Sequence, residues 1–259
     1  MKESMVKYFV LIKTYIKYYH KYPMSIFLKL IYMPIQLLMY MFLWIAISKY
    51  SEIDLKYLIC YYLFVILLTN AFPFAHIASY IHNDIFEGII FNFLVRPVSY
   101  IVPYAARYIS WMLCYSIVFF PSVLFVIIYA KIKLLNVLLF CVSLLIGLMI
   151  EFLIWINAGF TSMRIEKVKG VIMVTMVLKS LSSGNLIPFQ LLPDNVRRIV
   201  ECLPFKYYIS EPINVLLQGK EPDLFFEYIV SAVIWIIALC LMAALQWNCN
   251  IKHLQMNIS

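Results

Sequence analysis

Glu151 and Lys179 are charged residues that interrupt two long apolar stretches of the sequence. Glu151 lies 13 residues before Arg164, and Lys179 lies 12 residues after Lys167. If both stretches are helices that meet at the turn containing Arg164 and Lys167, a rise of about 1.5 Å per residue places both charges roughly 18–20 Å from that turn. A single charge near the centre of a bilayer costs about 2.5–3.5 kcal/mol or more. The spacing therefore predicts that Glu151 and Lys179 pair, or share a water-filled cavity, on adjacent antiparallel helices.

Two roles are open to such a pair: a structural ion pair between spans, or a polar point on the path of a transported substrate. Catalytic roles have little support, because the six glycines form no GxxxxGK[ST] phosphate-binding loop and the sequence has no HExxH or GxSxG motif. The four histidines are too dispersed to suggest a metal site. We therefore expect no enzyme activity, catalytic residue, metal site or cofactor on this chain.

The composition requires a bilayer around most of the chain. Of the 259 residues, 64% are hydrophobic and 13% are charged, and this charged share is about half that of an ordinary soluble domain. Apolar stretches longer than roughly 18 residues are typical of transmembrane helices. The net charge of +8 comes from lysines and arginines that flank these stretches, where they contact anionic lipid head groups. The pattern excludes a soluble domain and gives no support to nucleic-acid binding.

The sequence thus predicts an all-α, polytopic membrane protein that forms a single transmembrane domain over residues 1–259. Six membrane-spanning helices are expected, at roughly 24–48, 57–79, 104–130, 134–161, 170–187 and 225–247. Pro34, Pro73 and Pro121 are expected to kink their spans, and Asn70 and Asn157 to hydrogen-bond between helices. Because the lysines and arginines of the N-terminal segment and the short loops favour the inner side, we expect both termini in the cytoplasm.

An amphipathic helix over residues 3–22 is expected before the first span. Its apolar face and its basic face consist, respectively, of Met5, Phe9, Ile12, Ile16 and Tyr19, and of Lys13, Lys17 and Lys21. This pattern is typical of an interfacial helix that lies in the membrane plane with its basic side chains toward lipid phosphates. A simple lysine-rich tail is the alternative.

Residues 80–103 form a connecting segment that is too long for a simple turn and falls on the cytoplasmic side. Polar residues such as Asp84 and Glu87 alternate there with apolar residues such as Phe91, which predicts a short amphipathic helix. Gly88 permits close approach or a bend. The segment is either an ordinary interfacial loop or an element that docks into a groove on a soluble partner, with an apolar ridge and a few charges to fix its register.

Residues 184–224 form a second long segment, on the outer side. It contains five prolines and is too apolar for a solvated loop. Proline interrupts regular helices, so we expect short helices that dip partway into the membrane or lie on its outer face. Irregular backbone at that depth must be shielded by protein or water.

Both connecting segments carry a family resemblance. EGIIFNFLVRPVS (87–99) resembles the G-x-x-x-x-x-L-x-R/K-P signature of bacterial ABC exporter permeases of the type-two, ABC-2-like class. GNLIPFQLLP (184–193) and LPFKYYISEPINVLLQG (203–219) are similar to the stretch after the fifth span in the six-span branch of that class. With the amphipathic N-terminal helix, the resemblance covers nearly the whole chain.

The resemblance implies a division of labour between subunits. Such permeases pair with themselves or with a sister permease, and bind two copies of a soluble ABC ATPase that carries the ATP and Mg²⁺. The stretch Asp84–Pro97 would be the coupling helix, with Glu87, Gly88, Leu94, Arg96 and Pro97 as the matching positions. An external re-entrant element that gates the exit would contain Gly184, Pro188, Pro193, Leu203, Pro204 and Phe205.

The function expected from these features is that of the membrane-spanning subunit of an ATP-driven exporter in the bacterial cytoplasmic membrane. Its apolar interior favours an amphipathic or lipidic cargo, such as a peptide, a drug or a lipid-linked molecule. One alternative is an ion-coupled secondary transporter or channel that uses Glu151 and Lys179. Another is a membrane assembly or immunity protein that transports nothing.

Overall fold

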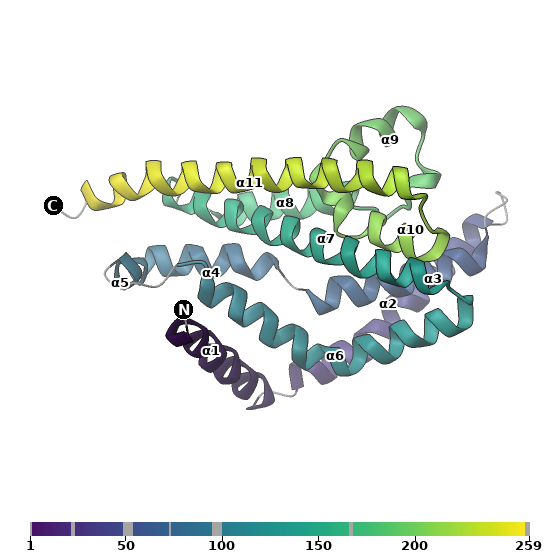
Figure 1. Ribbon diagram of the computed structural model, residues 1–259, viewed down its shortest axis with the longest axis horizontal. Helices are drawn as coiled ribbons and strands as arrows, with labels where there is room; N and C mark the ends of the chain where they lie inside the picture. The colour runs from purple at the N-terminus through teal and green to yellow at the C-terminus, as the bar shows by residue number, and fades with distance from the viewer. Residues whose placement is uncertain are drawn as a thin grey trace. The chain divides into compact units, whose positions relative to one another are not determined.

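A computed structural model describes residues 2–21, 24–48, 54–72, 74–94, 100–165 and 168–256. These residues form eleven α-helices and three short 3-10 helices, and they contain no β-strand (Figure 1). The expected all-α class is therefore confirmed.

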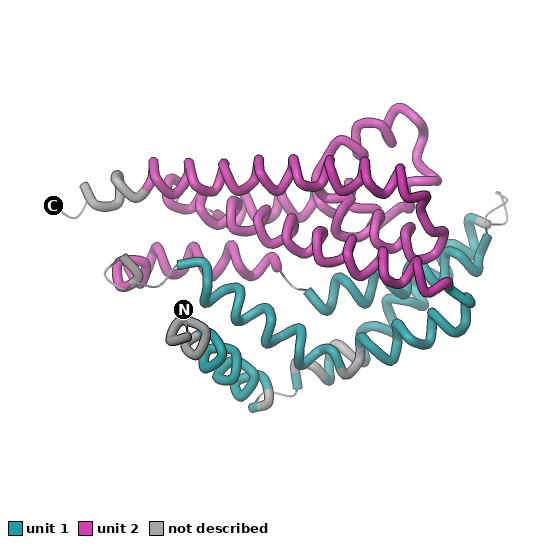
Figure 2. The backbone as a smooth tube through the Cα atoms, in the orientation of Figure 1, with its two compact units in different colours: residues 1–73, 97–132 teal, residues 74–96, 133–259 magenta. Residues whose placement is uncertain are grey.

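The helices divide into two compact units, coloured separately in Figure 2. Unit 1 comprises residues 1–73 and 97–132, and unit 2 comprises residues 74–96 and 133–259. A single permease domain over the whole chain stays a prediction.

Unit 1 contains four helices. They are α1 (Lys2–Lys21), α2 (Met24–Ser48), α3 (Leu55–Ala71) and α6 (Val102–Ala130). Helix α3 packs against both α2 and α6. Between α2 and α3, the rings of Tyr40 and Tyr62 stack with centroids 4.3 Å apart. The Asn70 amide also donates to Gln36 Oε1 at 3.2 Å, which confirms the interhelical bond expected for Asn70.

Helix α1 packs against α6 through part of the face that the sequence marks as apolar. The Ser110 hydroxyl donates to the Ile12 carbonyl at 3.0 Å, and the Tyr19 and Trp111 rings meet edge to face at 5.1 Å. Phe9, however, is 68% exposed. The stripe that contacts α6 is therefore rotated away from Phe9, and the placement of α1 in the membrane plane stays a prediction.

Unit 2 is built around α7 (Leu134–Phe160). Its other α-helices are α4 (Ala75–Phe86), α5 (Ile90–Leu94), α8 (Val168–Ser182), α9 (Asp194–Glu201), α10 (Ser210–Gln218) and α11 (Pro222–Met256). Its 3-10 helices are η1 (Thr161–Met163), η2 (Phe189–Leu191) and η3 (Pro204–Tyr207). Helices α4, α10 and α11 all pack along α7 (Figure 1).

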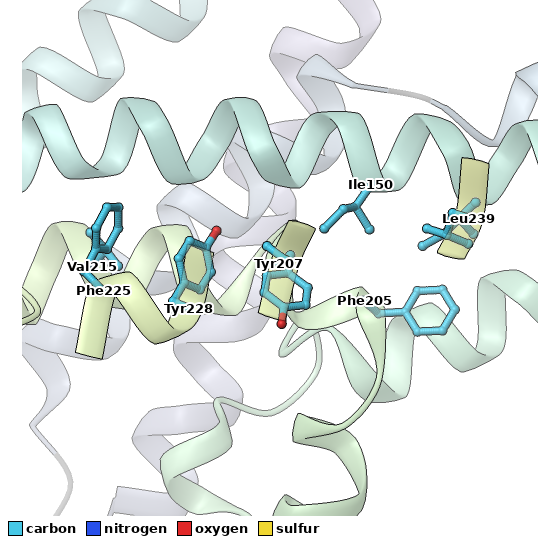
Figure 3. Packing of buried hydrophobic residues seen from close by; sticks show 9 residues of the cluster. Ile150, Phe205, Tyr207, Val215, Phe225, Tyr228 and Leu239 are labelled. Carbon is cyan, nitrogen blue, oxygen red and sulfur yellow. The ribbon is translucent and has the colours of Figure 1, made fainter. Parts of the chain in front are cut away.

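An apolar cluster joins α7 to α11, η3 and α10. It contains Ile150, Ile154, Phe205, Tyr207, Val215, Phe225, Tyr228, Ala232 and Leu239. Figure 3 shows these side chains in a row along the helix that carries Ile150. The amide of Asn157 adds a hydrogen bond to the Leu239 carbonyl at 3.1 Å. The interhelical bond expected for Asn157 is therefore confirmed, and it ties α7 to α11.

Three helical runs in the described residues are long and apolar enough to cross a membrane: Leu55–Phe86, Leu134–Met163 and Pro222–Asn250. A fourth is formed if Val102–Ser116 and Phe119–Ala130, bent by 56° relative to each other, count as one span. The bend falls in the turn before Pro121, whose ring cannot fit the preceding helical turn. Helix α2 contributes the shorter apolar stretch Ile31–Ile47. The count of six spans stays a prediction.

Two of the expected spans differ in detail from the helices of the structure. The stretch 57–79 is divided between α3, which ends at Ala71, and α4, which begins at Ala75; Pro73 lies outside the described residues. The stretch 170–187 is helical only as far as Ser182, because Gly184 follows with a left-handed φ of +81° and Pro188 comes next. At 15 residues, α8 is shorter than an ordinary span.

Candidate functional site

The expected coupling segment contains two helices rather than one. Helix α4 continues to Phe86, and the Glu87 amide closes its end by donating to the Asn83 carbonyl at 2.8 Å. Gly88 then takes a φ of +72°, a conformation that favours glycine, and α5 begins at Ile90. The segment expected as a short amphipathic helix is thus divided into two helices at Gly88, where the sequence allowed a bend.

The turn between α4 and α5 presents an aromatic and an acidic residue on the surface of unit 2. Phe86 is 83% exposed, and Glu87 beside it is exposed as well. Asp84 and Phe91 are half-buried. Leu94 is the last residue of α5.

Arg96 and Pro97, which complete the signature, lie outside the described residues. The side chain of Leu94 does as well. The expected end of the helix at Pro97 therefore stays a prediction.

Helix α4 is held tightly on α7. Ile77, Ala78 and Ile81 are fully buried, and a Cβ atom at Gly159 of α7 would lie 2.7 Å from Ile81 Cδ1 and 3.2 Å from Ala78 Cα. The Phe74 and Phe152 rings add an edge-to-face contact with centroids 6.3 Å apart. Because these contacts leave little room between the helices, α4 cannot shift toward α7 unless α7 moves or its side chains repack.

Glu151 and Lys179, placed at equal depth by counting residues, form an ion pair in the structure. Glu151 Oε1 accepts from Lys179 Nζ, and the same oxygen accepts from Trp155 Nε1 at 2.7 Å. Glu151 is fully buried, and its second oxygen, Oε2, has no hydrogen-bond partner among the described residues. The pair thus lies between α7 and α8 in a nearly dry environment.

The segment after η3 closes over this ion pair. The Nζ of Lys179 lies 4.3 Å from the centroid of the Tyr208 ring, and Tyr208 is fully buried. One residue after the end of α8, the Ser183 carbonyl accepts from the Ser210 amide at 3.0 Å. The expected external segment is therefore fastened to α8 by its backbone and by the side chain of Lys179.

Tyr207 and Tyr208 pack with their backbone directly against α7 at Gly147. A Cβ atom at Gly147 would lie 2.0 Å from the Tyr207 carbonyl oxygen and 3.0 Å from Tyr208 Cα. No residue with a side chain fits there without a shift of the backbone. The Tyr207 hydroxyl continues the connection by donating to Ser231 Oγ of α11 at 2.8 Å.

The residues expected in the external gate are divided between two places. Pro188 and Pro193 directly precede η2 and α9, and Pro188 is buried while Pro193 is exposed. Leu203 precedes η3, Pro204 opens it, and Phe205 reaches the apolar cluster on α7. Gly184 is buried just after α8. The short helices expected in 184–224 are present as η2, α9, η3 and α10.

Sequence reasoning missed Gly147, Trp155 and Tyr208 as neighbours of the ion pair. For the first two, a signal was available: Gly147 lies four residues before Glu151 and Trp155 lies four after it, so all three share one helix face. Tyr208 carried no such signal, because its position depends on how the irregular segment folds back.

A protein-family model matches most of the chain. Residues 30–257 match the model of a family described as "ABC-2 family transporter protein". A search of curated protein sequences gives no significant match. The matched range is most of the chain and includes the α4–α5 turn, the ion pair and residues 184–224, and the chain therefore belongs to the ABC-2 transporter family.

Proposed function

We propose that this chain is the membrane-spanning subunit of an ATP-driven exporter. Family membership makes it the membrane permease of an ABC transporter, a class that works with an ABC ATPase. In the proposal, ATP and Mg²⁺ bind to a separate soluble subunit, and this chain provides the pathway and makes no covalent bond. The cargo is an amphipathic or lipidic molecule, which matches the apolar composition of the chain.

One observation supports the proposal most strongly: α7 makes close contacts at two points, one with helix α4 and one with residues 184–224. An exporter has to connect these two segments. Helix α4 packs on α7 at Gly159, and the external segment packs on it at Gly147. The two glycines are 12 residues apart, or about 18 Å along the helix. A movement at the α4–α5 turn therefore has a short, rigid route to the external segment.

The α4–α5 turn is the proposed docking element for the ATPase. Phe86 supplies an exposed apolar group next to the carboxylate of Glu87, and interfaces of this kind depend on such anchors with nearby charges for register. Asp84, Gly88, Phe91, Leu94, Arg96 and Pro97 complete the element. In the proposal, the ATPase moves this turn when it binds ATP, α7 transmits the movement, and the external segment opens.

The proposed assembly contains two such permeases, the second being the same chain or a sister permease, and two ATPase subunits. It lies in the bacterial cytoplasmic membrane with both termini in the cytoplasm. Gly184, Pro188, Pro193, Leu203, Pro204 and Phe205 belong to the external gate.

A detergent pull-down of the tagged chain from its native membrane tests the proposal. We expect a soluble ABC ATPase to co-purify with the wild type and to be lost from Glu87→Lys and Phe86→Ala. Phe226→Ala is the matched control, because Phe226 is 66% exposed but lies just after the external segment. If no ATPase accompanies a folded wild-type chain, the docking assignment is wrong, and ion-coupled transport through Glu151 and Lys179 becomes the explanation to test.

A further inference from the structure

Lys179 contacts both a long helix and the external segment. Its ammonium group pairs with Glu151 of α7 and lies over the ring of Tyr208, which follows η3. The side chain is 16% exposed, so both contacts are made largely out of water. An ammonium group is attracted to a carboxylate and to the face of an aromatic ring, and both attractions strengthen when water is excluded.

The two contacts of Lys179 differ in strength. The carboxylate of Glu151 is fully buried and is also held by Trp155, one turn along the same helix. Separating Lys179 from Glu151 would leave two unpaired charges inside the membrane, which is costly. Of the two contacts of Lys179, the one with Tyr208 is the weaker, since it is an attraction to a ring, and that ring also meets Phe74 edge to face at 6.3 Å. The contact with Tyr208 is therefore the one that can open and close.

Close to Tyr208, the same segment also contacts Ser183, the residue that follows α8. The Ser210 amide reaches the Ser183 carbonyl at 3.0 Å, and Ser183 itself is fully buried. The Ser183 hydroxyl has no hydrogen-bond partner in the part of the chain that the structure describes. Ser182 and Ser183, at and just after the end of α8, are thus buried, while Leu181 beside them is 61% exposed.

We propose that Lys179 is a latch that holds the external segment closed, with Glu151 as its fixed anchor and Tyr208 as its releasable contact. Opening of the segment separates Tyr208 from Lys179 and uncovers Ser183, while the ion pair stays intact. This inference rests on the proposed function, because it treats residues 184–224 as the gate of an exporter. It adds Lys179 and Tyr208 as the positioning residues of that gate.

Labelling of a cysteine at position 183 tests the latch directly. The reporter is Ser183→Cys combined with Cys202→Ser, since Cys202 is exposed in the same segment. A membrane-impermeant maleimide is added to intact cells, and the labelling rate is measured by gel shift. Asn195→Cys serves as the accessible reference, because Asn195 is exposed on α9.

Two variants release the latch in different ways. Tyr208→Leu removes the ring and leaves the ion pair. Glu151→Gln with Lys179→Met removes the ammonium group without leaving a buried charge unpaired, and this second variant keeps the test valid if Tyr208→Leu does not fold. Tyr207→Phe is the control, because it removes the hydrogen bond to Ser231 and leaves Lys179 and Tyr208 unchanged.

We expect the cysteine of Ser183→Cys to react about tenfold faster in each release variant than in the reporter chain without it. With Tyr207→Phe added, the cysteine should react at the rate of the reporter chain alone. Equal rates in the wild type and a folded release variant would overturn the latch. A failure of Asn195→Cys to react in intact cells would also overturn it, because the segment would not face outward. Labelling needs neither nucleotide nor the ATPase, so a failure of the ATPase pull-down would reject the proposed function without changing this result.

Discussion

The backbone of Tyr207 lies so close to Gly147 that a methyl group on Gly147 would come within 2.0 Å of the Tyr207 carbonyl oxygen. This contact sets the distance between Tyr207, in residues 184–224, and α7. It also lies one helical turn from Glu151, whose partner Lys179 reaches Tyr208. Gly147 and the Glu151–Lys179 pair thus contact two consecutive residues, Tyr207 and Tyr208.

Gly147→Ala is expected to destabilise the protein by about 3 kcal/mol, because the atom in the way belongs to the backbone and cannot rotate aside. Gly170→Ala is the matched control. Nothing lies within 4 Å of a Cβ atom at Gly170, so alanine there should be neutral or should stabilise α8 by up to about 1 kcal/mol. Equilibrium unfolding in mixed micelles measures both, and equal stability of the two variants would contradict the close contact.

Removing one partner of the Glu151–Lys179 pair is expected to cost more than removing both. Glu151→Gln and Lys179→Met should each destabilise by about 3–5 kcal/mol if the remaining charge stays buried without a partner. The double variant should recover a large part of that loss, because glutamine can still accept from Trp155. The coupling free energy of the double-mutant cycle measures this recovery. Additive losses would mean that the two residues do not depend on each other.

Asn157→Leu is expected to cost about 0.6 kcal/mol, the average for a hydrogen bond between helices inside a membrane. The loss is small because Asn157 Oδ1 is buried without a partner among the described residues, and leucine removes that unpaired group along with the bond to Leu239. Asn248→Leu, at an exposed position of α11, should change the free energy of unfolding by less than about 0.5 kcal/mol. A loss above about 2 kcal/mol at Asn157 would point to a larger polar network there.

Regular features of the fold could be predicted from the sequence, and irregular ones could not. Counting residues from the 164–167 turn placed Glu151 and Lys179 at equal depth, because a helix converts sequence separation directly into height. Hydrophobicity likewise predicted α2 and α7 almost to the residue. These features depend on local geometry alone.

The missing features depend on tertiary contacts. The early end of α8 follows from the bends after Ser182, and the position of Tyr208 over Lys179 depends on a segment that folds back through two 3-10 helices and a short α-helix. The break after Phe86 depends on the left-handed conformation of Gly88, which the sequence permits but does not require. Gly88 and Gly184 marked places where the chain can bend, but packing selects whether it bends there, and composition and periodicity carried no signal for the position of Tyr208.

Photo-crosslinking from position 86 tests whether the α4–α5 turn docks an ABC ATPase. A photoreactive phenylalanine analogue replaces Phe86 in the α4–α5 turn, or Phe226 at the start of α11 as the control, and both complexes are irradiated in native membranes. We expect a soluble ABC ATPase to be crosslinked from position 86 and not from position 226. If position 86 yields only lipid or no protein adduct while the chain is folded, this turn does not dock an ATPase.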